Sequence, residues 1–196
     1  MKKSWIIIGV IVVIIFIIYR FFAGSYNNMV QYNEDVKSVW AKVETQYQRR
    51  GDLIDNLVNT VKGYADFEKS TLTAVIEARS QATQIKLDAN DLTPEKIAQL
   101  QQAQDQLKGS LNRLLVTVEQ YPNLKANEGF LKLQDELAGT ENRIAVARDN
   151  FNEAARSYNV YIQSFPRNIL AGMFNFHPKG YFESTPGSEK APTVKF

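Results

Sequence analysis

The chain has 196 residues, a formal net charge of +2, no cysteine and a single histidine, His177. This length accommodates one domain with its own core and an additional anchor. The lack of cysteine excludes disulfides, thiolate catalysis and cysteine-ligated zinc. The positive excess lies in residues 1–25, and the nearly neutral remainder has no basic stripe, so we predict that nucleic acid is not a partner.

Residues 4–19, SWIIIGVIVVIIFIIY, form an uncharged apolar run. A membrane-spanning helix needs about 20 apolar residues. Residues 21–23 extend the run to that length if Arg20 reaches its guanidinium out to the lipid headgroups. The sequence therefore predicts a helix that crosses a membrane.

A cleaved signal peptide is the alternative, but Phe22 lies where the cleavage region needs a small side chain. We therefore predict an uncleaved membrane anchor over residues 1–25. Two lysines, Lys2 and Lys3, precede the span and only Arg20 closely follows it. This difference favours a cytoplasmic N-terminus and a periplasmic body in a bacterial inner membrane.

From residue 26 the pattern becomes amphipathic, with Val36, Trp40, Val43 and Tyr47 on one helical face. The apolar stripe continues without a change of phase through Ile54, Leu57, Val58, Val61, Ala65, Glu68, Leu72, Val75 and Arg79. Gly51 weakens a helix by about 1 kcal/mol relative to Ala, and Asp52 can cap a new one. Two alternatives stay open: one kinked helix of about sixty residues, or two antiparallel helices that turn at residues 50–52.

Residues 86–93 are predicted to form a loop, and Thr93 followed by Pro94 is a strong helix start. The helix that follows ends before Pro122, and its seam has one polar interruption, Gln104. That seam consists of Ile97, Leu100, Gln104, Leu107, Leu111, Leu114, Val118 and Tyr121.

A last long helix is predicted from Asn127 to Pro166. Large side chains recur every seven residues at Phe130, Leu137, Ile144, Phe151, Tyr158 and Phe165. A second row, with small residues in its middle, comprises Leu133, Thr140, Ala147, Ala154 and Tyr161, and would allow a neighbouring helix to approach closely. No β-strand alternation is present, so the fold class is all-α, with a helical body over residues 26–166.

Residues 167–183 form an aromatic segment that is too apolar for a free linker. We expect it to dock on the end of the body, on a partner or at the membrane interface. A body of four helices would return this segment to the membrane side, and one of three would leave it at the far tip. Residues 184–196 are predicted to be a flexible C-terminus.

No catalytic, cofactor-binding or metal-ligating set emerges from the sequence. Arg49, Arg50 and Asp52 fit either an anion or partner site or a solvated turn, and we favour the turn. A second polar group fits a partner surface and structural contacts equally well: Glu141, Asn142, Arg143, Arg148 and Asp149. A carboxylate metal site is disfavoured because the Glu-x-x-His partner motif is missing from the set of Glu44, Asp55, Glu68 and Glu77.

Three blocks of sequence resemble the LemA family, in the same order. They are residues 40–72, WAKVETQYQRRGDLIDNLVNTVKGYADFEKSTL, residues 141–159, ENRIAVARDNFNEAARSYN, and the tripeptide SFP at residues 164–166. Family members commonly carry Pro where Asp55 stands, which supports a break near residues 50–52. The resemblance implies an antiparallel, up-and-down four-helix bundle with long helices, held to a bacterial inner membrane, without catalytic residues or cofactor.

Members of the LemA family are similar in being encoded near membrane proteases and TPM-domain membrane proteins, so the resemblance makes such a protein a candidate partner. Our leading hypothesis is a non-enzymatic, membrane-anchored scaffold that self-associates or binds another membrane protein. The alternative is a lipid-binding or envelope-remodelling module that uses the aromatic segment. An enzyme is a distant third hypothesis, and it would depend on His177.

Overall fold

A computed structural model describes residues 2–64 and 67–183, and side chains from Trp5 onward. The described residues are helical, with no strand among them. The helices are α1 (Lys2–Lys62), α2 (Lys69–Gln84), α3 (Pro94–Val118), α4 (Pro122–Lys125), α5 (Glu128–Gln163) and α6 (Arg167–Met173). The fold class is therefore all-α, as predicted.

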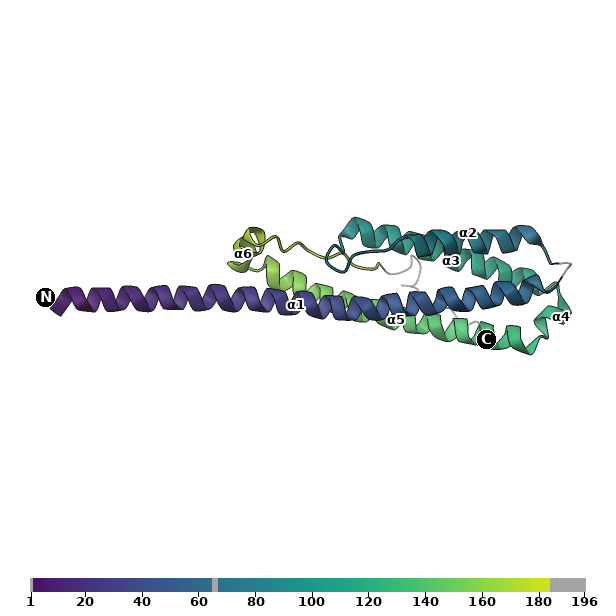
Figure 1. The fold of residues 1–196 in the computed structure, drawn as a ribbon, viewed down its shortest axis with the longest axis horizontal. Helices are drawn as coiled ribbons and strands as arrows, with labels where there is room; N and C mark the ends of the chain where they lie inside the picture. Colours follow the sequence, from purple (N-terminus) through teal and green to yellow (C-terminus); the bar gives the residue numbers. More distant parts are fainter. Residues whose placement is uncertain (1, 65–66, 184–196) are drawn as a thin grey trace, which may run out of the picture.

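α1 runs unbroken from the apolar N-terminal segment into the body (Figure 1). Its N-terminal part is long and apolar enough to cross a membrane, and the large apolar side chains of residues 5–22 are exposed. No other described helix meets that criterion. The chain thus carries a candidate membrane span that is continuous with the body.

Of the two alternatives left open at residues 50–52, the antiparallel turn is wrong, because α1 continues through these residues to Lys62. Gly51 is buried inside the helix, and burial of the flanking Leu53 and Ile54 outweighs its modest helix penalty. The chain reverses instead between Gly63 and Glu68, where Phe67 is buried in the core. A single helix through residues 54–79 is therefore wrong at the reversal, although Leu72 and Val75 of the predicted stripe are buried beyond it. Ala65 lies outside the described residues.

Two pairs of helices form the body: α1 packs along α5, and α2 packs on α3. Two apolar clusters follow one another along its length. The cluster nearer the N-terminal segment includes Trp40, Phe151 and Tyr158, and the farther one includes Ile54 and Phe130. The body is long and narrow (Figure 1). Its core consists of two clusters, one after the other along the long axis.

The predicted starts of α3 and α5 are confirmed. Thr93 accepts a hydrogen bond from the backbone N–H of Lys96, with Pro94 in the first turn. Asn127 accepts one from the backbone N–H of Phe130 at 2.9 Å. These side-chain caps satisfy donors that a helix start leaves unpaired.

The seven-residue row on α5 faces the core as far as Tyr158, with Leu137 partly exposed. Phe165 departs from the row and is 80% exposed, because the helix has already ended at Gln163. The short helix α6 follows, which the sequence pattern did not predict. It lies at the end of the body from which the apolar segment projects (Figure 1).

Candidate functional site

A buried polar layer separates the two apolar clusters and brings together side chains from three helices. Arg50 of α1 is only 3% exposed. Its guanidinium donates to the carboxylate of Glu141 on α5 at 2.9 Å and also to the buried amide oxygen of Gln104 on α3. Lys108 pairs with the other oxygen of Glu141 at 3.0 Å. The layer therefore links α1, α3 and α5 at one level of the body.

Burial raises the pKa of Glu141, but the Lys108 and Arg50 cations outweigh this effect and hold that pKa below its usual range. Burial also lowers the pKa of Arg50, although the nearby Glu141 carboxylate opposes that shift. Arginine nonetheless remains protonated at any physiological pH. The layer is therefore a fixed charge network, and a buried pair of this kind is best suited to setting the register of packed helices.

Arg148 extends the network toward the N-terminal segment. Its Nε donates to the Tyr47 hydroxyl at 2.8 Å, and its guanidinium lies over the Tyr47 and Phe182 rings. Burial raises the pKa of Tyr47 above its ordinary value, and the Arg148 cation offsets only part of this rise, so the phenol stays protonated. Of the polar group predicted on α5, Glu141 and Arg148 thus make internal contacts, whereas Asn142, Arg143 and Asp149 are exposed.

The other predicted polar residues do not converge on one site. Arg49 lies 4.0 Å from Glu136 rather than from the partners of Arg50, and Asp52 accepts a hydrogen bond from Gln48 at 3.0 Å. Asp55 pairs with Arg79 across the first chain reversal.

Metal binding and histidine chemistry gain no support from the geometry. Within residues 2–64 and 67–183, no group of three His, Asp or Glu side chains is placed to hold a metal ion. Glu44 and Glu77 are exposed, and Glu68 contacts Ser70. His177 is exposed in the C-terminal segment.

The segment after α6 is held along the body by three side-chain amides. Asn159 bonds both the N–H and the C=O of Lys179 at 2.8 Å. Asn152 does the same for Phe182, and Gln101 does the same for Glu183. Each amide supplies a donor and an acceptor, so the extended backbone is satisfied without a β-strand partner.

Gly180 lets this segment pass close to the start of α3. Its N–H donates to the Leu92 carbonyl at 2.8 Å, and an added Cβ would lie 2.7 Å from the Cα of Pro94. Next to it, the Lys179 ammonium donates to the carbonyl of Asn90, and burial lowers the pKa of that lysine. The contact requires glycine at position 180.

Phe182 closes the apolar cluster that surrounds Trp40. Its ring stacks on Trp40, with centroids 6.3 Å apart, and meets Phe151 edge-on at 5.5 Å. Phe182 is 5% exposed, so most of its surface is removed from water. Residues 179–183 of the aromatic segment thus pack along the side of the body, rather than only on its end as expected.

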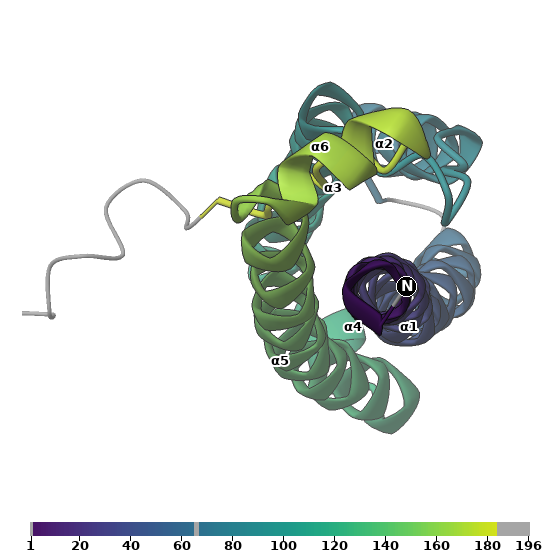
Figure 2. The ribbon, with the colours of Figure 1, turned by 90° about the vertical axis from the view of Figure 1, so that its left-hand side faces the viewer.

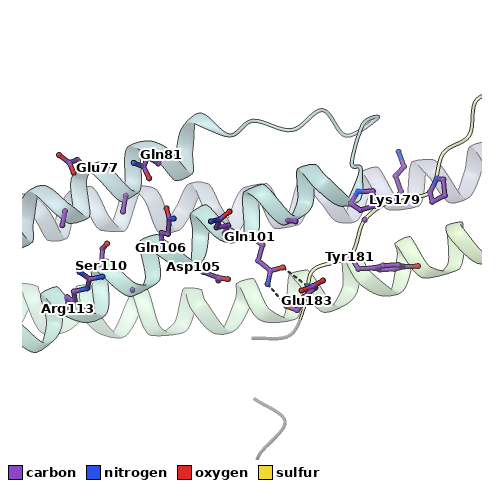
Figure 3. Close-up of a pocket in the computed structure, with 18 of the residues that line it drawn as sticks. Glu77, Gln81, Gln101, Asp105, Gln106, Ser110, Arg113, Lys179, Tyr181 and Glu183 are labelled. Carbon is purple, nitrogen blue, oxygen red and sulfur yellow. Dashed lines mark hydrogen bonds between the residues drawn. The ribbon is translucent and has the colours of Figure 1, made fainter. Parts of the chain in front are cut away.

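A groove of about 1270 Å³ lies between α2, α3 and the docked segment (Figure 3). Its walls combine apolar surface with charges of both signs, namely Glu77, Asp105 and Glu183 against Arg113 and Lys179. The groove is large and partly open to solvent, so it suits a protein surface better than a small substrate.

The sequence contains a signal for some of these features. Gln104 interrupts an otherwise apolar seam, and such an interruption indicates a polar partner on a facing helix. Lys62 followed by Gly63 is typical of the end of a helix. The amide contacts of Asn152 and Asn159 could not be predicted from the sequence, because both residues lie within a regular helix and contact a segment that is distant in the sequence.

A comparison with family models matches residues 39–196 to the LemA family. Magnetosome protein MamQ 2 from Paramagnetospirillum magneticum is 26% identical over 183 residues, covering 84% of this chain and 66% of its own length. Magnetosome protein MamQ from Magnetospirillum gryphiswaldense is 27% identical over 183 residues, which again cover 84% of this chain and 66% of the relative's length. Protein LemA from Metamycoplasma hominis is 25% identical over 169 residues, covering 86% of this chain and 74% of its own length.

Proposed function

The chain belongs to the LemA family, and we propose that it is a non-enzymatic, membrane-anchored helical scaffold of the bacterial cell envelope. The observation that carries the proposal is the unbroken helix α1, which joins the candidate membrane span to the body. A continuous helix transmits its orientation, so the body stands at a set distance and direction from the bilayer.

The internal polar contacts support a structural role. Arg50, the most buried charged side chain among the described residues, registers α1 against α3 and α5 through its bonds to Gln104 and Glu141. The caps at Thr93 and Asn127 and the amide contacts of the C-terminal segment likewise serve packing. We infer from these contacts an antiparallel up-and-down four-helix bundle built for rigidity.

The division of the chain stays a proposal: an anchor over residues 1–25, the bundle over 26–166 and a docked segment over 167–183. The flexible C-terminus predicted for residues 184–196 lies outside the described residues. For topology we propose an inner-membrane protein with a cytoplasmic N-terminus and a periplasmic body. Protease treatment of intact spheroplasts tests this topology, because only an outward body is cleaved.

For the partner we propose a second copy of this chain or another membrane protein, such as a membrane protease or a TPM-domain protein. The groove between α2, α3 and the docked segment is the surface that favours such binding. A photo-crosslinker at Gln102, which lines the groove, should capture the partner in intact cells. The same group at Val146, on an exposed face of α5, is the matched control.

Light scattering on the full chain in detergent completes the test. A self-associating or complexed species, with crosslinks at position 102 and not at 146, supports the scaffold. A strict monomer that forms no crosslink at position 102 contradicts it.

A second candidate function is a lipid-binding or envelope-remodelling module. The exposed apolar side chains of residues 165–174 favour it. Vesicles that change size or leak when the full chain is incorporated, and do not when residues 167–182 are deleted, would support remodelling. Unchanged vesicles would reject remodelling and leave the scaffold standing.

A further inference from the structure

Helix α6 lies across the end of the body that faces the membrane span. Figure 1 places α6 at the end from which the apolar segment projects, and Figure 2 shows it crosswise in front of the ends of α2, α3 and α5. α1 points toward the viewer in the same view. If α1 crosses a bilayer, α6 lies roughly parallel to the bilayer surface.

α6 and its approach have one buried and one exposed apolar face. Leu170 and Ala171 are buried in the cluster that contains Trp40. Phe165, Ile169 and Met173 follow one another at four-residue spacing and are 80%, 57% and 66% exposed. Spacing by four places Ile169 and Met173 on one side of α6, and Phe165 is exposed in the turn just before the helix begins. The exposed stripe therefore faces away from the body.

The position of α6 along α1 is fixed by aromatic contacts. Tyr26 packs on the rings of Phe174 and Phe176, with centroids 4.9 and 5.9 Å apart. Residues 4–23 span about 30 Å as a helix, which matches the thickness of a bilayer's hydrocarbon core. Tyr26 then lies about 4.5 Å beyond that core, inside the headgroup layer.

Charge at this level suits a membrane surface. Residues 4–33 and 164–182 contain no Asp or Glu. Arg20 is exposed on α1, and the guanidinium of Arg167 stacks over Tyr161 at 4.3 Å. Arg20 and Arg167, on segments that carry no Asp or Glu, complement anionic phospholipid headgroups.

We propose that α6 is a foot that rests in the headgroup layer of the bilayer that α1 crosses, with Phe165, Ile169 and Met173 inserted at the acyl boundary. The foot and the span hold the membrane at two points, so together they set the tilt of the body. This proposal rests on the proposed membrane anchoring, because a chain without a spanning α1 has no bilayer at this level. It requires no remodelling of the membrane.

The chain contains no cysteine, so single cysteines allow clean labelling of the full protein. Ile169→Cys carries a fluorophore at the foot, Val146→Cys is a control at an exposed site on α5, and Val12→Cys reports on the anchor. The three proteins are placed in nanodiscs of phosphatidylcholine and phosphatidylglycerol with and without nitroxide-labelled lipid. The nitroxide quenches only a label that lies within the bilayer.

We expect strong quenching at position 12, only background quenching at 146, and quenching at 169 about twofold or more above that background. Quenching at 12 with position 169 equal to 146 would overturn the foot and leave the anchor intact. A label at 169 that is shielded from water but not quenched would also overturn the proposed foot, because protein and not lipid would then cover the exposed apolar side chains of α6. No quenching at 12 would overturn the anchor itself, and the foot with it.

Discussion

Glu141→Leu should destabilise the body by about 2–3 kcal/mol. Removal of one partner of a buried ion pair costs about 3–5 kcal/mol, because the remaining charge is left uncompensated. Here Arg50 is 3% exposed, but the Glu141 side chain is 36% exposed and also pairs with Lys108, which places the loss at or below the low end of that range. The assay is urea unfolding of the full chain in detergent, followed by the fluorescence of the buried Trp40.

The matched control is Glu136→Leu, which removes the partner of the neighbouring Arg49. That pair is 4.0 Å apart with side chains 54% and 37% exposed, so its loss should cost about 0.5 kcal/mol or less. Replacement of the whole layer, by Arg50→Met, Gln104→Leu and Glu141→Leu together, should return stability to within about 1 kcal/mol of the parent. Equal losses at 136 and 141, or a triple variant as unstable as Glu141→Leu, would refute the reasoning.

Three further predictions concern packing and titration. Phe182→Ala should cost about 3–5 kcal/mol in the same unfolding assay, whereas Phe165→Ala, at an 80% exposed site, should cost about 0.5 or less. Gly180→Ala should cost about 1–3 kcal/mol because its Cβ would collide with the start of α3, whereas Gly172→Ala meets nothing within 4 Å and should be neutral or slightly stabilising. The depressed pKa of Glu141 means that its stabilisation is present above the usual value of 4.5 and is lost as the pH falls through the folded-state pKa. Urea unfolding from pH 7 to pH 3 should therefore show a steeper loss for the parent than for Glu141→Gln, and parallel curves would contradict this assignment.

Local signals predicted the parts of the fold that local chemistry decides. Thr93 with Pro94 and Asn127 mark helix starts because each cap forms within one turn. The seven-residue row on α5 predicted its buried face because burial repeats with the helix.

The remaining features depend on contacts between distant segments. The apolar stripe keeps its phase across the reversal after Lys62, so periodicity alone could not reveal the turn. The pairing of Arg50 with Glu141 joins two polar groups that the sequence presents 91 positions apart. The position of α6 depends on the contact between Tyr26 of α1 and Phe174 at the end of α6, two residues that are far apart in the sequence.

A pair of spin labels on α1 tests the central claim that one rigid helix joins the membrane to the body. Val10→Cys lies in the apolar segment and Val30→Cys in the body, and both sites are exposed. Twenty residues of unbroken helix separate them by about 30 Å. Pulsed electron–electron distance measurement in nanodiscs should give a single narrow distribution near that value. A broad or clearly shorter distribution would show a hinge between anchor and body and would contradict the account.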